Sequence, residues 1–147
     1  MQTILNIAGL VNDSIVDGPG IRFTIFAQGC SHDCPGCHNP ESQPFCGGTP
    51  TAVEEIIANV QANGLVQGVT LSGGECLMHA DFCAALLKSL KENGISTAVD
   101  TCGFVPRAAF DKVIPYTDVF LYDIKAVDSD LHKRLTGVSN DKIIENL

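Results

Sequence analysis

The sequence predicts an α/β fold in which a parallel sheet is flanked by helices. Four short segments rich in β-branched and aromatic residues are each followed by helical spacing of apolar residues, an alternation typical of a parallel sheet. The expected strands cover residues 21–27, 69–71, 95–99 and 119–124. A closed eight-stranded barrel takes about 250 residues. The 147 residues of this chain therefore leave room for an open, partial (β/α) barrel of about four βα units at most.

Helix signals lie between and after these strands. A first helix is expected over residues 51–62, because Thr51 and Glu54 have the spacing of a capping box. A second helix is expected over residues 80–93, where apolar residues share one face and Gly94 follows. Three further residues mark the starts of later helices: Pro106, Ser129 and Asn140.

Composition limits the class of protein. The chain is 45% hydrophobic and carries a net charge of −8, without the clustered lysines and arginines of a nucleic-acid-binding surface. It has no apolar run of the roughly 20 residues that cross a membrane, and its N-terminus lacks the features of a signal peptide. We therefore expect one cytoplasmic domain over residues 1–147 that binds neither nucleic acid nor membrane.

Three cysteines, Cys30, Cys34 and Cys37, lie within eight residues on one loop. In a reducing compartment such a group is more often metal-binding than disulfide-bonded. Four-iron clusters usually take four thiolates, so a loop with three leaves one iron open to another ligand. The alternative is a structural zinc site completed by His32 or His38. The other four cysteines show no second metal spacing and receive no role: Cys46, Cys76, Cys83 and Cys102.

The residues with chemical potential follow the carboxyl ends of the expected strands. The cysteine loop follows the first strand, residues 72–75 (Ser-Gly-Gly-Glu) follow the second, and Asp100 follows the third. Asp123 and Lys125 close the fourth strand. In parallel βα folds ligands bind at this edge. The sequence therefore predicts that these segments form one site.

Taken together, these segments resemble the glycyl-radical-enzyme activating enzymes of the radical S-adenosylmethionine (SAM) family. The matching segments, in order and with similar spacing, are residues 15–23, 30–40, 72–75, 100–104, 123–125 and 135–140. The resemblance implies that Cys30, Cys34 and Cys37 are catalytic and hold a single 4Fe-4S cluster whose free iron binds SAM. It implies reductive cleavage of SAM to a 5′-deoxyadenosyl radical, which generates a glycyl radical on a partner enzyme of the pyruvate formate-lyase type. A flavodoxin or ferredoxin would supply the electron.

The resemblance also assigns residues to SAM and to the partner. The positions that match the SAM contacts of the family are Gly36, Cys37, His38, Gly73, Gly74, Glu75, Asp100, Asp123, Ile124 and Lys125. At Gly36, where many relatives have an aromatic residue, only a backbone contact with adenine is implied. Asp17 matches the position where the partner's glycine loop enters. From the residues alone, Asp123 and Lys125 could instead form a salt bridge at the rim, and His32, His79 and His132 are expected to be solvated.

Two alternatives to this interpretation remain open. Activating proteins of anaerobic ribonucleotide reductase have about this length and share the Cys-Pro-Gly-Cys of the cluster loop. Because the segments 100–103 and 135–140 fit the longer class better, we expect a truncated chain of that class. A zinc-stabilised binding module without catalysis is the alternative from a different functional class.

Overall fold

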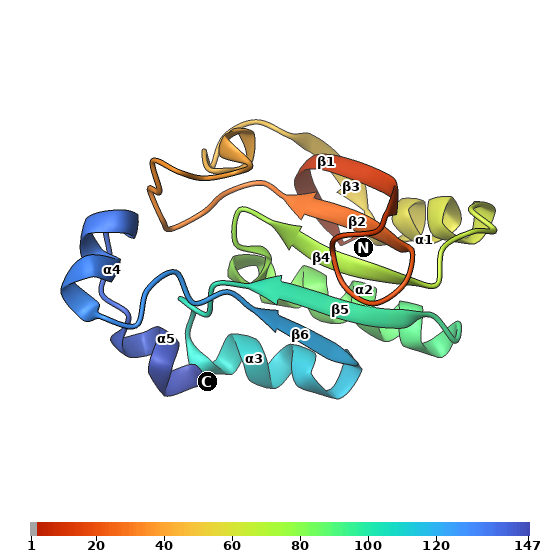
Figure 1. Cartoon of the computed structure of the whole chain (residues 1–147). Coiled ribbons are helices and arrows are strands. Elements are labelled where there is room, and N and C mark those ends of the chain that lie inside the picture. The colour runs from red at the N-terminus through yellow and green to blue at the C-terminus, as the bar shows by residue number, and fades with distance from the viewer. Residues whose placement is uncertain (1–2) are drawn as a thin grey trace.

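The computed structural model describes residues 3–147, which form a six-stranded mixed sheet with α-helices packed on one face (Figure 1). The strands are β1 (Ile4–Ser14), β2 (Arg22–Ala27), β3 (Thr49–Ala52), β4 (Gly68–Gly73), β5 (Ser96–Thr101) and β6 (Val119–Tyr122). Their order across the sheet is β3-β1-β2-β4-β5-β6. Within the described residues β3 and β6 are the two edges, so the sheet is open, as the sequence predicts.

The four predicted strands are those that run parallel. β2, β4, β5 and β6 pair in parallel, with Phe23 opposite Val69 and Val99 opposite Phe120. Their carboxyl ends therefore reach the same end of the sheet, where the loop after β2 also lies (Figure 1). The sequence did not predict β1 and β3, which pair antiparallel at the other edge.

Five α-helices follow the strands. They are α1 (Val53–Ala62), α2 (Ala80–Glu92), α3 (Arg107–Val113), α4 (Ser129–Thr136) and α5 (Asp141–Asn146). Short 3-10 turns occupy η1 (Pro40–Ser42), η2 (Cys76–His79) and η3 (Ile114–Tyr116). No helix in the described part of the chain is long and apolar enough to span a membrane.

The hydrophobic core lies between the sheet and the first three α-helices. Ile56 of α1 and Leu86 and Leu90 of α2 are fully buried, as are Val69 of β4 and Val99 of β5. Burying an aliphatic side chain of this size stabilises a fold by about 1.5–3 kcal/mol. The core therefore holds the strands rigidly beneath the loops that follow them.

Two predicted helix caps are wrong. Thr51 belongs to β3, where it pairs with Leu5, and α1 begins without a side-chain cap. At the start of α4 the capping carboxylate is that of Asp128, which accepts a hydrogen bond from the backbone N–H of Leu131 (2.8 Å). Ser129 is the first residue inside this helix. In both places the residue predicted to cap the helix lies one position away from the observed N-cap, which is Ala52 for α1 and Asp128 for α4.

The segment between β1 and β2 crosses the face of the sheet that the helices leave open (Figure 1). Arg22, almost fully buried, holds this segment from below. Its guanidinium donates to the Val69 carbonyl (2.8 Å) and to Thr70 Oγ1 (3.1 Å). The Thr70 hydroxyl in turn donates to the carbonyl of Asp17 (2.6 Å). The crossing segment is thus fixed to β4.

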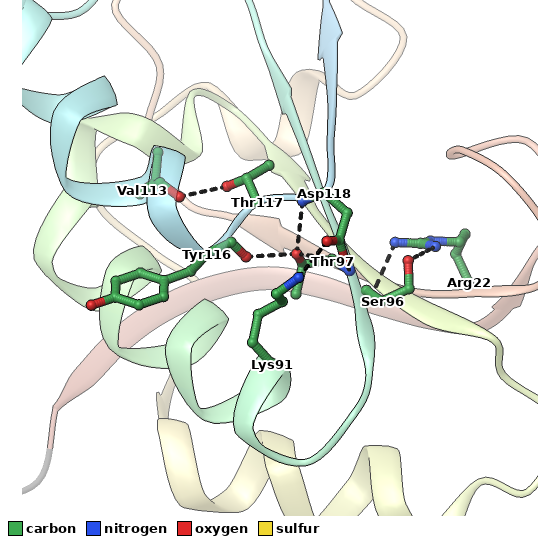
Figure 2. A network of polar contacts seen from close by, with 8 residues as sticks. All are labelled: Arg22, Lys91, Ser96, Thr97, Val113, Tyr116, Thr117 and Asp118. Atoms are coloured by element: carbon green, nitrogen blue, oxygen red, sulfur yellow. Dashed lines mark hydrogen bonds and ion pairs between the residues drawn. The ribbon is translucent and has the colours of Figure 1, made fainter.

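A polar network joins the starts of β5 and β6 (Figure 2). Asp118 Oδ2 accepts a hydrogen bond from the backbone N–H of Thr97 (2.9 Å), and the Asp118 carboxylate also pairs with Lys91 of α2. The Thr97 hydroxyl donates to the Tyr116 carbonyl (2.6 Å). These contacts set the register of β6 against β5, and thereby the positions of the residues that follow β6.

Candidate metal centre

A cavity of about 290 Å³ lies at the carboxyl ends of the parallel strands. Its walls come from the loop after β2, from the ends of β4 and β5, from the segment after β6 and from α4. The predicted site residues that line it are Cys30, Cys34, Gly36, Cys37, His38, Gly73, Gly74, Asp100, Asp123 and Lys125. The structure therefore brings together residues from four separate segments of the sequence.

The cysteine loop is fixed by hydrogen bonds at its start and in its middle. The N–H groups of Gly29 and Cys30 donate to the carbonyls of Ser42 (2.7 Å) and Gln43 (3.0 Å). Further along the loop, the N–H of Asp33 donates to the carbonyl of Thr136 at the end of α4 (2.9 Å). The loop is therefore held between η1 and α4.

Two of the three sulfurs accept hydrogen bonds from the backbone. His32 N–H donates to Cys30 Sγ (3.4 Å), and Asn39 N–H donates to Cys37 Sγ (3.4 Å). Burial raises the pKa of the thiols of Cys30 and Cys34. Metal binding removes these protons, and N–H groups directed at sulfur then stabilise the thiolates.

The donor set fits an iron–sulfur cluster better than a single ion. All three thiols are free and line one cavity. Residues 3–147 contain no group of three or more His, Cys, Asp or Glu side chains placed to hold one metal ion. A zinc site needs four donors about 2.0–2.3 Å from a single ion, whereas each thiolate of a 4Fe-4S cluster binds a different iron.

Gly73 and Gly74 allow β4 to approach the start of the cysteine loop closely. Gly73 has a φ of +122°, which side chains rarely adopt, and a Cβ there would lie 2.2 Å from the backbone nitrogen of Ala27. A Cβ on Gly74 would lie 2.1 Å from the carbonyl oxygen of Gly29. Both positions therefore require glycine, and they bring the backbone of β4 to the cavity wall.

Glu75 does not line the cavity, although the resemblance assigns it to SAM. Its side chain is fully buried, and its carboxylate accepts three hydrogen bonds. The donors are the Thr101 hydroxyl (2.7 Å), the Cys102 N–H (2.8 Å) and the Leu77 N–H (3.1 Å). The backbone N–H of Glu75 also donates to the carbonyl of Gly29 (2.9 Å). Glu75 therefore ties the end of β5 to the start of the cysteine loop.

Charged side chains form another part of the cavity wall. Lys125 and Asp123 form an ion pair, the salt bridge that the sequence left as an alternative. Burial alone would lower the pKa of Lys125, but the hydrogen bond and charge of Asp123 raise it. Burial raises the pKa of Asp100, although its Oδ2 accepts a hydrogen bond from the Ser72 hydroxyl (3.1 Å). Ile124, between the paired residues, is not part of the cavity wall.

Asp17 does not line the cavity and belongs to the segment between β1 and β2. Its carboxylate accepts a hydrogen bond from the Ser14 hydroxyl (2.5 Å). The two residues before it, Ile15 and Val16, are strongly exposed. Asp17 therefore lies beside an exposed apolar tip.

The expectation that His32 and His132 are solvated is wrong. His32 is 4% exposed and lines the cavity, and His132 is fully buried. Their rings meet edge to face with centroids 5.6 Å apart. Burial lowers the pKa of His32 to about 4. The available sequence signal was the helical spacing of His132 and Thr136, which places both on one side of α4.

Cys102, which received no role from its spacing, also lines the cavity. Its thiol is buried, and burial raises its pKa far above the ordinary value. The remaining three cysteines lie elsewhere: Cys46 is exposed, and Cys76 and Cys83 are buried in the core. The cavity thus holds four thiols, of which three share one loop.

The fold and the cavity define an α/β domain built to hold an iron–sulfur cluster. The profile of the family described as 4Fe-4S single cluster domain matches residues 16–144, and the chain belongs to this family. It is 37% identical over 152 residues to the pyruvate formate-lyase 1-activating enzyme of Escherichia coli (strain K12), covering 99% of this chain and 62% of that enzyme. With the pyruvate formate-lyase-activating enzyme of Clostridium pasteurianum it shares 40% identity, over 84% of this chain and 53% of the relative.

The chain thus spans less than two thirds of the length of these curated relatives. Their names support the resemblance to activating enzymes of glycyl radical enzymes, and they do not support the ribonucleotide reductase or zinc-module alternatives. Among solved structures, Streptococcus suis SuiB bound to precursor peptide SuiA matches with a TM-score of 0.63 and 22% identity, over 80% of this chain and 27% of that one. This similarity supports the predicted fold, a partial (β/α) barrel.

Proposed function

We propose that this chain acts in a radical SAM activase that generates a glycyl radical on a partner enzyme of the pyruvate formate-lyase type. The observation that carries the proposal is the single cavity in which three loop cysteines meet the residues matching SAM-binding positions. The names of the relatives support the choice of reaction. Cys30, Cys34 and Cys37 would hold the 4Fe-4S cluster.

When bound, the reduced cluster supplies the electron that cleaves the sulfonium of SAM. The chain's own residues bind and orient the nucleotide. The backbone of Gly36, Cys37 and His38 would contact the adenine, and Gly73 and Gly74 would place their backbone against the methionine end. These segments already share one cavity.

The charged wall would hold the polar end of the nucleotide. Lys125 carries a cation to the cavity and would donate to the carboxylate of SAM or to its ribose. Asp123 and Asp100 would bind the nucleotide or a monovalent cation beside it. Glu75 and Ile124 would act from behind this wall, because neither lines the cavity.

The partner would approach the open face of the sheet. Asp17, fixed to Thr70 through its carbonyl, would contact the glycine loop of the partner enzyme. A flavodoxin or ferredoxin would donate the electron. We place the protein in the cytoplasm, because all seven cysteines are free and a reducing compartment keeps them so.

Anaerobic reconstitution of the chain with iron and sulfide tests this proposal. We expect about four iron and four sulfide per chain, visible absorption, and methionine with 5′-deoxyadenosine after reduction in the presence of SAM. Cys34→Ala should lose the cluster, whereas Cys46→Ala, which changes an exposed cysteine, should keep it. A colourless protein with zinc and no sulfide would contradict the cluster, and a cluster without SAM cleavage would contradict the activase.

The partner is tested separately. The reconstituted chain, SAM and a reductant are mixed with a candidate glycyl radical enzyme, and the glycyl radical is measured by electron paramagnetic resonance. Asp17→Asn should reduce radical formation while leaving SAM cleavage in the absence of the partner unchanged. Equal loss of both activities would assign Asp17 to the nucleotide site.

A further inference from the structure

His32 stands between two of the cluster cysteines and has no use in the proposed function. Its side chain is 4% exposed, and neither ring nitrogen finds a hydrogen-bond partner among residues 3–147. Buried polar groups in folded proteins are nearly always hydrogen-bonded, and exceptions often mark a missing ligand or ion. The ring of His32 therefore has no hydrogen-bond partner among the described residues, although the Nε2 of the neighbouring His132 ring is also buried without one.

The surroundings of His32 keep its ring inside. It packs against the rings of Phe104 and His132, with centroids 5.6 Å away in each case. His132 is fixed by the hydrogen bond from its Nδ1 to the Val138 carbonyl (2.7 Å). The backbone next to His32 is fixed by the hydrogen bond from Asp33 to Thr136. The ring is thus held away from water, which would otherwise satisfy it.

A bound cluster would offer sulfur acceptors to this ring. The carboxylates of Asp123 and Asp100, which also line the cavity, are already engaged with Lys125 and with the Ser72 hydroxyl. His32 lines the cavity together with Cys30, Cys34 and Cys37, and its backbone N–H already donates to Cys30 Sγ. An imidazole carries at least one N–H in either tautomer. Sulfide and thiolate sulfurs of a bound cluster accept such hydrogen bonds, and these bonds help to set the reduction potential.

We propose that the ring of His32 donates a hydrogen bond to a sulfur of the 4Fe-4S cluster and thereby raises the reduction potential of that cluster. The inference rests on the proposed function, since it requires the cluster. A donor directed at sulfur stabilises the reduced cluster, which carries more negative charge, over the oxidised one. His32 is then a positioning residue that acts on the cofactor without binding iron.

A mononuclear metal site completed by His32 is not favoured by the structure. The part of the chain that the structure describes contains no set of three or more His, Cys, Asp or Glu side chains arranged around one metal position. His32 therefore does not complete a mononuclear site with its neighbouring cysteines. A hydrogen bond to the cluster requires only that an N–H of the His32 ring lie next to a cluster sulfur, without any bond to iron.

Redox titration of the reconstituted chain without SAM tests the inference. Two variants remove the N–H donor: His32→Phe keeps an aromatic ring, and His32→Leu replaces it with an aliphatic side chain. A third variant, His32→Gln, retains an N–H donor. We expect the midpoint potential of the cluster to become more negative in both apolar variants, with iron and sulfide content unchanged, and to return towards the wild-type value in His32→Gln. The control is His79→Phe, which replaces a histidine outside the cavity and should keep the wild-type potential.

The outcomes separate the inference from the proposed function. A wild-type chain that takes up no iron and sulfide overturns both. A wild-type cluster whose potential is the same in His32→Phe and His32→Leu overturns the inference alone. Loss of one iron in these variants would instead make His32 a ligand, and a weaker affinity for SAM at unchanged potential would make it a nucleotide contact. Each of these last two results also overturns the hydrogen bond to sulfur.

Discussion

Glu75 shows how a single buried carboxylate can organise a site that it does not line. We expect Glu75→Gln to lower the free energy of unfolding by about 2 kcal/mol, because an amide N–H then faces a backbone or hydroxyl donor where an oxygen accepted before. Denaturant unfolding of the cluster-free chain measures this change. Glu55→Gln, on the exposed side of α1, is the matched control and should alter stability by less than about 0.5 kcal/mol.

The same pair of variants distinguishes an internal role of Glu75 from a role in nucleotide binding. If Glu75→Gln unfolds at the same denaturant concentration as the wild type but binds SAM more weakly, the carboxylate serves the ligand and the hydrogen bonds to Thr101 and Cys102 contribute little.

Which side chains a residue meets was the hardest property to predict from the sequence. The spacing of Cys30, Cys34 and Cys37 is local, so the order of residues is enough to identify their common loop. His32 and His132 are a hundred residues apart in the chain, and nothing in either neighbourhood indicates that their rings touch. Glu75 follows a glycine pair as expected, but the direction of its side chain depends on the end of β5.

The cap of α4 illustrates the elements that hold the cysteine loop. Asp128→Ala removes the acceptor of the Leu131 N–H and should destabilise the chain by about 1 kcal/mol. Ser129→Ala removes a hydroxyl that caps nothing and should have an effect within about 0.5 kcal/mol. Denaturant unfolding compares the two. If Ser129→Ala lowered the free energy of unfolding more than Asp128→Ala, Ser129 would be the capping residue, as the sequence predicted.

The polar network of Asp118, Thr97 and Lys91 that joins β5 and β6 makes the stability of the protein depend on pH. The hydrogen bond from Lys91, followed by that from the Thr97 N–H, holds the pKa of Asp118 below its ordinary value of 3.8. The contribution of this carboxylate to stability is thus present above pH 3.8 and is lost as the pH falls through the lowered pKa.

We therefore expect the free energy of unfolding of Asp118→Asn to fall less steeply than that of the wild type when the pH is lowered from about 5 to about 3. Unfolding curves at several pH values measure the two slopes. Asp13→Asn, at an exposed position of β1, serves as the reference. Parallel slopes for Asp118→Asn and the wild type would show that the network does not depend on this charge.

The elements that the sequence predicts are those with strong local patterns. β2, β4, β5 and β6 are apolar because helices or the crossing segment cover them, and they were recognised for that reason. β1 mixes Asn6, Gly9 and Asn12 among its apolar residues, and β3 contains Pro50. Proline is tolerated in β3 because this strand is an edge of the sheet, a fact that only the assembled sheet reveals.

At the scale of the whole molecule, the cavity joins early and late segments of the chain. The cysteine loop contacts η1, β4 and α4, so a bound cluster should stabilise all of these against local opening. We expect reconstitution to slow amide hydrogen exchange in α4 more than in α1, which lies outside the cavity wall. Mass spectrometry of the reconstituted and chelator-treated chains measures the difference. Equal exchange of α4 in both states would mean that the loop holds its cluster without this helix.

The general position of the site was predictable because parallel strands bring their carboxyl ends to one edge. Four segments, each identified alone, were expected to meet there, and the cavity contains residues from all four. The complete set of residues that line the site was not predictable. His32 and Thr136 belong to the cavity wall because of the way α4 and the loop after β5 pack against the cysteine loop.

The hydrogen bond between Asp33 and Thr136 has a consequence for how the protein is made. During synthesis the three thiols leave the ribosome long before the helix that closes over them, so for much of translation they are exposed to oxidants and to stray metal. Domains generally fold as units once enough of the chain has emerged. Iron and sulfide delivery would then be most selective once α4 has been synthesised and has packed against the loop, when the chain presents a formed cavity in place of three exposed thiols.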